Sequence, residues 1–196
     1  MIGCSSILFL ILVACGTSEE DSPGDIHADI EVQSFPEAVE NADLIADVTI
    51  IKQVGERDKP SPKTTFNTQI NQIIKGDIDL SGENILVDQQ GNSEWIFNDN
   101  DLFKKEQQYI LFLKKTIGTD ESDYWIQGEE TGVFKEVETG ISVKLAYSAD
   151  ELETLDVSST LNGKTIQTLE NNPTFKDYQT VDKDHLIDRI KEEISN

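Results

Sequence analysis

Two stretches of the chain carry the hydrophobic patterns of β-strands. Within residues 65–74, phenylalanine, threonine and isoleucine side chains alternate with asparagine and glutamine, which predicts a strand with one face in water. Residues 109–114 read Tyr-Ile-Leu-Phe-Leu-Lys and are apolar on both faces. We expect this strand to be the most buried, with Leu111 or Phe112 fully enclosed.

Other short runs rich in apolar and β-branched residues predict further strands. They lie at residues 44–51, 84–89, 94–97, 124–127, 133–136 and 141–144. A polar stretch with two prolines, residues 55–63, predicts a loop, and glycines separate the last three runs. Short strands at this spacing are typical of an antiparallel barrel or a sandwich.

Helical signals lie at both ends of this β region. Ser34 followed by Glu37 has the pattern of a capping box and predicts a short helix through Asn41. Residues 149–155 predict a second short helix, whereas Asn162-Gly163 is a turn signal. Apolar residues at helical spacing predict a final helix over residues 182–194, with an aspartate as its N-cap.

The N-terminus resembles a bacterial lipoprotein signal. Residues 7–14 are eight consecutive apolar residues, whereas a membrane-spanning helix needs about 20. They end in Leu12-Val13-Ala14-Cys15, which resembles a lipobox, although residues 1–6 contain no lysine or arginine. The resemblance implies that a diacylglyceryl group is added to the Cys15 thiol. It also implies that a peptidase cuts before Cys15.

The remaining patterns divide the chain into four parts. We expect a signal peptide at 1–14, a lipidated Cys15 with an acidic linker at 15–33, a β-barrel domain at 34–147 and a C-terminal extension at 148–196. The linker carries aspartates and glutamates without any lysine or arginine, and such a segment has too little apolar surface to fold alone.

Composition narrows the location and the partners. The 196 residues include 16 Lys and Arg against 38 Asp and Glu, a formal net charge of −22. This charge disfavours nucleic acid and anionic membrane surfaces, so we expect a neutral or basic protein partner. After processing, the sole cysteine is Cys15, which leaves no thiol for a disulfide or a zinc site. We expect a lipid-anchored protein on the extracytoplasmic face of a Gram-positive cell membrane.

The body of the chain resembles a known group of proteins. The shared motifs are Ala42-Asp43-Leu44-Ile45, Ile74-Lys75-Gly76-Asp77, the run at 109–114 and Gly132-Val133-Phe134-Lys135. They resemble an uncharacterised group of Gram-positive extracytoplasmic proteins. Their order is also similar to the netrin-like module of the tissue inhibitors of metalloproteinases. This resemblance implies an OB-type five-stranded barrel.

Inhibition is not implied by the resemblance. The metalloproteinase inhibitors chelate zinc through a free N-terminal cysteine that disulfides brace, whereas here Cys15 would carry lipid and no bracing cysteines are present. The predicted fold is therefore mainly β: a small antiparallel OB-like barrel with a short N-terminal helix and a C-terminal helical extension.

Candidate chemistry is sparse. His27 and His185 have no second histidine or cysteine nearby, so neither predicts a metal site. Residues 77–82 resemble the start of a calcium loop, but Asp88 stands at the twelfth position instead of glutamate, and a polar turn is expected. Hydroxyls at 158–160 lack a histidine base, and acids are too numerous to identify a catalytic pair. We therefore expect no catalytic residues, no metal and no cofactor.

Three functions remain open at this point. The first is a non-catalytic binding or accessory module, which suits the anchor and the β-rich body. The second is an inhibitor or immunity factor that acts on a basic enzyme or toxin. The third is a cell-surface enzyme that uses carboxylates. Trp95 and Trp125 could anchor a partner, although a tryptophan that caps the end of a barrel is more common.

Overall fold

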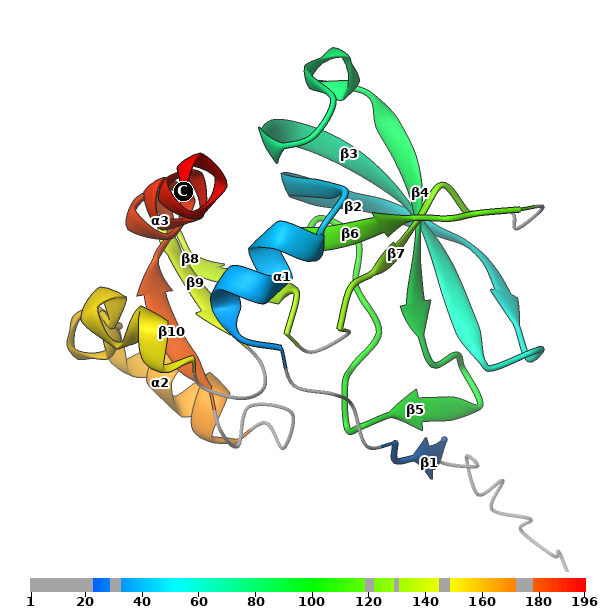
Figure 1. Ribbon diagram of the computed structural model, residues 1–196. Coiled ribbons are helices and arrows are strands. Elements are labelled where there is room, and N and C mark those ends of the chain that lie inside the picture. Colours follow the sequence, from blue (N-terminus) through cyan, green and yellow to red (C-terminus); the bar gives the residue numbers. More distant parts are fainter. Residues whose placement is uncertain (1–22, 29–32, 119–121, 129–130, 145–148, 172–177) are drawn as a thin grey trace, which may run out of the picture.

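The computed structural model describes residues 23–28, 33–118, 122–128, 131–144, 149–171 and 178–196, and these are mainly β (Figure 1). The strands are β1 Gly24–Ile26, β2 Leu44–Arg57, β3 Lys63–Lys75, β4 Asn84–Gln90, β5 Trp95–Phe97, β6 Gln108–Lys115, β7 Tyr124–Ile126, β8 Val133–Glu138, β9 Ile141–Lys144 and β10 Gln179–Asp182. The α-helices are α1 Phe35–Asn41, α2 Gly163–Glu170 and α3 Lys183–Ser195. Short 3₁₀ turns span Ile78–Leu80, Asp150–Leu155 and Ser158–Thr160.

Strands β2, β3, β4, β6 and β7 close into a five-stranded barrel. Strand β2 pairs antiparallel with β3 and β6, β3 pairs with β4, and β6 pairs with β7. The parallel pairing of β4 with β7, which sets Val87 beside Tyr124, closes the circle. The expected OB-like barrel is confirmed.

Strand β6 is buried on both faces, as its apolar run predicts. Tyr109, Leu111 and Leu113 face the core inside the barrel. Ile110 and Phe112 face a second core outside the barrel. Leu111 and Phe112 are both 0% exposed, so the expected enclosure is met at both positions.

Helices α1 and α3 cover the second core beside β6 (Figure 1). The Ser34 hydroxyl accepts the Glu37 backbone N–H, and the Glu37 carboxylate accepts the Ser34 backbone N–H, so the predicted capping box is present. The predicted cap of the last helix is also present, because the Asp182 carboxylate accepts the His185 backbone N–H at 2.9 Å. Local capping therefore begins both helices that cover this face.

Strands β7 and β8 both pair with the same edge of β6, but β7 belongs to the barrel and β8 belongs to a side sheet. The Phe112 carbonyl accepts from Gln127 N, and Phe112 N donates to the Gly132 carbonyl, each at 2.9 Å. Beyond this point β8 pairs with the first half of β6, and β9 and β10 continue the sheet away from the barrel. The short strands expected in the barrel region thus divide between the barrel and a side sheet.

The linker prediction is wrong for residues 24–26, which form β1. This strand pairs parallel with β5, and Gly24 packs so closely on Trp95 that a Cβ there would lie 2.6 Å from the indole ring. The acidic composition did not reveal this strand because backbone hydrogen bonds and a glycine contact hold it. Neither feature requires an apolar side chain on β1 itself.

Two further local predictions need correction. Asn162-Gly163 is the start of α2 and not a turn, because the Asn162 side chain accepts the Lys164 and Thr165 backbone N–H groups at 3.0 Å. Asparagine is favoured at turns and helix N-caps for the same reason, its short side chain that accepts local N–H groups. The loop expected at 55–63 begins later, because β2 continues through Arg57.

The predicted signal peptide and Cys15 lie outside the described residues. Within the described residues, none of the helices has the length and apolar character needed to cross a membrane.

Candidate functional site

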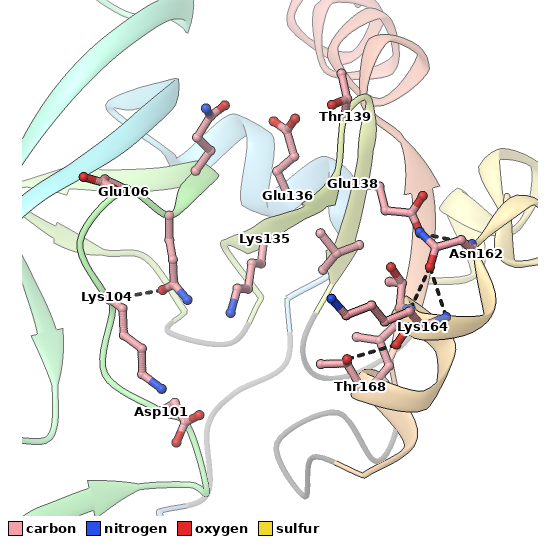
Figure 2. Close-up of a pocket in the computed structure, with 15 residues that line it drawn as sticks. Asp101, Lys104, Glu106, Lys135, Glu136, Glu138, Thr139, Asn162, Lys164 and Thr168 are labelled. Carbon is pink, nitrogen blue, oxygen red and sulfur yellow. Dashed lines mark hydrogen bonds between the residues drawn. The ribbon is translucent and has the colours of Figure 1, made fainter.

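A groove of about 810 Å³ lies between the barrel and the C-terminal extension. One wall comes from residues 101–108, which lead into β6, and the opposite wall comes from residues 162–169, the N-cap and most of α2. Residues 135–139 of the β8–β9 hairpin lie between these walls (Figure 2). The groove thus joins three segments that are distant in the sequence.

Strand alternation and helix packing set the directions of the groove side chains. Phe134 lies in the core beneath α1 and α3, whereas Val137 packs with the cluster beneath α2. Lys135 shares the α2 side of β8 with Val137 because side chains alternate along a strand. Helix α2 is held by Leu169, which packs with Val143 of β9. This packing keeps the helical wall of the groove next to β8.

Three lysines from three segments line the groove. Figure 2 shows the ends of Lys135 and Lys164 pointing into the groove, whereas the end of Lys104 lies beside Asp101. Within the described residues, Lys104 and Lys164 form no salt bridge. The same lining contains the carboxylates of Asp101, Glu106, Glu136 and Glu138, so the groove carries charges of both signs.

The environment of Lys135 reflects these mixed charges. Burial lowers the pKa of the Lys135 ammonium, and the neighbouring Lys104 ammonium lowers it further. The Asp101 carboxylate acts in the opposite direction and raises this pKa. Lys135 therefore experiences both the positive charge of Lys104 and the negative charge of Asp101.

Two of the acids that line the groove already have structural partners. The Glu138 carboxylate accepts the Asn162 backbone N–H at 3.1 Å, and hydrogen bonds from Thr165 and Asn162 lower its pKa. Glu136 forms a salt bridge with Lys183, so its charge is compensated. These carboxylates fix the walls of the groove.

Lys183 connects the side sheet to the barrel. Its ammonium binds Glu136 and also Asp47 of β2, at 2.7 Å from the latter. Burial by itself would lower the pKa of Lys183, but hydrogen bonds and attraction from the two carboxylates raise it above its usual value. This buried charge network holds the start of α3 against β2 and β8.

The aspartates of the segment that resembles a calcium loop have separate structural roles in the fold. Asp77 is the N-cap of a short 3₁₀ turn, and its carboxylate accepts the Asp79 backbone N–H at 3.0 Å. Asp88, the expected twelfth ligand, is 2% exposed on β4 and binds Arg57, Thr65 and Ser122. The carboxylate of Asp88 is thus engaged inside the protein.

The two histidines lie in different environments. The His185 side chain is 71% exposed on α3, with its ring Nδ1 3.5 Å from the Asp182 carboxylate. His27 lies near Asp25 and Asp99, with ligand atoms within 4.8 Å of one another. All three residues are exposed, and exposed acidic groups often lie together without a metal, so we infer no site from their proximity.

The remaining candidates from the sequence occupy surface or structural positions. Trp95 and Trp125 are 41% and 39% exposed. Ser158–Thr160 form a 3₁₀ turn, and the Asp156 carboxylate accepts the Ser158 backbone N–H at 2.9 Å. The structure brings none of these described residues into the groove.

Sequence reasoning missed the groove altogether. The one available signal was the scarcity of lysine and arginine, which makes any basic residues that gather in space unusual. Their gathering could not be read from the chain, because Lys104, Lys135 and Lys164 belong to separate segments.

Comparison with known proteins finds no family model that matches this chain and no curated protein with significant sequence similarity. The fold and the geometry of the groove are therefore the basis for a proposed function.

Proposed function

We propose that this protein is an extracytoplasmic binding module, anchored to the membrane by lipid on Cys15 and without catalytic activity of its own. The groove beside α2 is its ligand site. The lipobox-like segment Leu12–Cys15 supports the anchor. The linker that follows would separate the barrel from the membrane surface.

The observation that carries this proposal is a groove of about 810 Å³ that side chains from three separate segments line (Figure 2). A groove of this volume is within the range typical of small-molecule sites. The two carboxylates of β8 that line the groove have structural partners. Glu136 forms a salt bridge with Lys183, and Glu138 accepts the Asn162 backbone N–H at the start of α2. The groove is therefore better suited to binding than to turnover.

Site-specific photocrosslinking in intact cells tests this function. A photoreactive residue at Thr168, an exposed position on the groove wall, should form an adduct with the bound ligand. The matched control places the same residue at Asp188, whose side chain is 69% exposed on α3 and does not line the groove. An adduct at Thr168 alone supports the proposal. Equal labelling at both positions, or none at Thr168, would contradict it.

The net charge of −22 favours a second candidate function, an inhibitor or immunity factor for a basic partner. Such a charge accelerates encounters with a basic protein, and salt screens the attraction. The association rate with a captured partner should then fall as ionic strength rises. A rate independent of salt would restrict the role of the charge to solubility.

A further inference from the structure

We propose that the side chains of Lys183 and Asp47 condense into an intramolecular amide bond, with Glu136 as the group that moves the proton. The bond would join the first residue of α3, in the C-terminal extension, to β2 of the barrel. This inference goes beyond the proposed function, because it concerns a modification of the chain itself and involves no external ligand.

The reacting groups already touch in the folded protein. The Lys183 Nζ lies 2.7 Å from Asp47 Oδ2, and the carboxyl carbon Cγ is one bond beyond that oxygen. The Glu136 carboxylate contacts the same Nζ. Groups held together in this way have an effective concentration on the order of 10⁵ M or more. This proximity favours an amide within one chain, although water opposes the same condensation between separate molecules.

The site is largely shielded from solvent at the edge of a core. The side chains of Lys183, Asp47 and Glu136 are 13%, 11% and 17% exposed. Asp47 is paired across the sheet with Ile110 of β6, which is 0% exposed. Burial makes charged groups costly and limits the access of water, so it favours a neutral amide over two separated ions.

Asn71 identifies Asp47, and not Glu136, as the acid that reacts. The Asn71 side-chain Nδ2 donates to Asp47 Oδ1 at 3.2 Å, on the oxygen that does not contact Lys183. Negative charge develops on this oxygen when the amine attacks, and an N–H donor placed there stabilises it. The free oxygen of Glu136 accepts the Gly140 backbone N–H at a longer distance, 3.4 Å.

The condensation balances without any co-reactant. One proton of the Lys183 ammonium passes to Asp47 Oδ2, and the lone pair of the neutral Nζ then attacks Cγ. The N–C bond forms, and the electron pair of the C=O π bond moves to Oδ1. Glu136 takes a second proton from Nζ and delivers it to the Asp47 hydroxyl, after which the Cγ–Oδ2 bond breaks. One water leaves, and Glu136 is again a carboxylate.

The raised pKa of Lys183 sets the rate of this reaction. The two carboxylates favour the ammonium form, so the neutral amine that attacks is a minor species. A slow reaction is sufficient, because each chain reacts only once. The product is a modified protein, which is distinct from turnover of a substrate.

An amide at this position would act as a covalent brace. Cys4 and Cys15 are the two cysteines of the chain, so no disulfide can join β2 to α3. A cross-link between residues 47 and 183 closes a long loop, and the restriction that it places on the unfolded chain grows with loop length. The C-terminal extension would then stay attached to the barrel even when their noncovalent contacts open.

Mass spectrometry of the folded full-length protein tests the inference. The intact wild type should be lighter by one water than its processed sequence, and a digest should contain a branched peptide that joins Asp47 to Lys183. Lys183→Arg and Glu136→Gln should both have the full mass. The matched control is Lys114→Arg: Lys114 meets Asp43 at 3.0 Å, but these side chains are 34% and 43% exposed. This variant should still lack one water.

The wild type decides the outcome even if a variant fails to fold. A wild-type chain of full mass with no branched peptide overturns the inference. A missing water that persists in Lys183→Arg overturns it as well, because the dehydration would then lie elsewhere. A branched peptide through Glu136 would overturn the assignment of Asp47 as the acid. None of these results depends on labelling at Thr168, so the proposed function is tested separately.

Discussion

At the scale of single residues, Asp88 shows how one buried carboxylate can connect three parts of the barrel. Both of its oxygens accept from Arg57 of β2, and it also accepts the Thr65 hydroxyl at 2.6 Å and the Ser122 hydroxyl at 2.8 Å. Burial by itself would raise the pKa of Asp88, but these hydrogen bonds outweigh it and lower the pKa. The charged form is therefore favoured in the folded state.

Asp88→Asn should destabilise the protein by about 3 kcal/mol at neutral pH, because it leaves the Arg57 guanidinium without its buried partner. A lowered folded-state pKa stabilises the protein above the unfolded value of about 3.9, and this contribution is lost as pH falls through the folded-state pKa. Urea unfolding at several pH values measures the difference between wild type and variant. That difference should shrink below about pH 4. A constant difference would contradict the role of the Asp88 charge.

Leu111 and Phe112 support two different cores from one strand. Leu111 faces the inside of the barrel and Phe112 faces the core beneath α1 and α3. Truncation of either residue to alanine should cost about 3–5 kcal/mol, because each is 0% exposed and would leave a cavity. Thermal unfolding measures the loss. Ile117→Ala, at a position 95% exposed, is the control and should leave the melting temperature nearly unchanged.

At the scale of elements, the passage from β7 to β8 decides where the barrel ends and the side sheet begins. The chain passes very close to β6 at Gly132, where a Cβ would lie 2.5 Å from the Gln127 carbonyl oxygen and 3.0 Å from the Phe112 Cβ. The carbonyl is backbone and has little freedom to move. A side chain at this position would therefore push β8 away from β6.

Gly132→Ala should destabilise the protein by about 1–3 kcal/mol, as overpacking of a tight site does. The matched control is Gly163→Ala at the first position of α2, where an added Cβ meets nothing within 4 Å. Alanine also favours helix, so this control should be neutral or slightly stabilising. Denaturant midpoints compare the two variants. Equal effects would show that the close approach at Gly132 is not important.

At the scale of the whole molecule, the arrangement of the elements places the groove at a junction. One wall leads into β6 of the barrel, and the other is α2 of the C-terminal extension. Lys183, through Asp47 and Glu136, ties the same two bodies together nearby. The C-terminal extension therefore supplies the wall that turns a barrel surface into a groove.

The predicted lipid on Cys15 would determine where the whole molecule lies in the cell. Cys15→Ser should abolish lipid addition and move the protein from the membrane fraction to the soluble fraction, because eight apolar residues are too few to span a bilayer. Metabolic labelling with a fatty acid measures lipid addition, and fractionation measures location. Cys4→Ser is the matched control and should leave both unchanged. A Cys15→Ser protein that still takes up label would refute the lipoprotein interpretation.

Local patterns along the chain predicted the features that depend on neighbouring residues. Alternation and apolar runs located the barrel strands, and the strand at 109–114 was correctly expected to be buried on both faces. Capping patterns located the starts of α1 and α3 at Ser34 and Asp182. These signals are readable because turns, caps and strand faces act over a few residues.

The way in which these elements combine depends on contacts between distant segments. The parallel pairing of β4 with β7, the division at Gly132 and the pairing of β1 with β5 all join segments through backbone hydrogen bonds, which carry little side-chain signature. The groove depends on the same long-range pairings, because they bring Lys104, Lys135 and Lys164 together from separate segments. Local patterns can specify each segment, but only chain closure brings distant charges to one place.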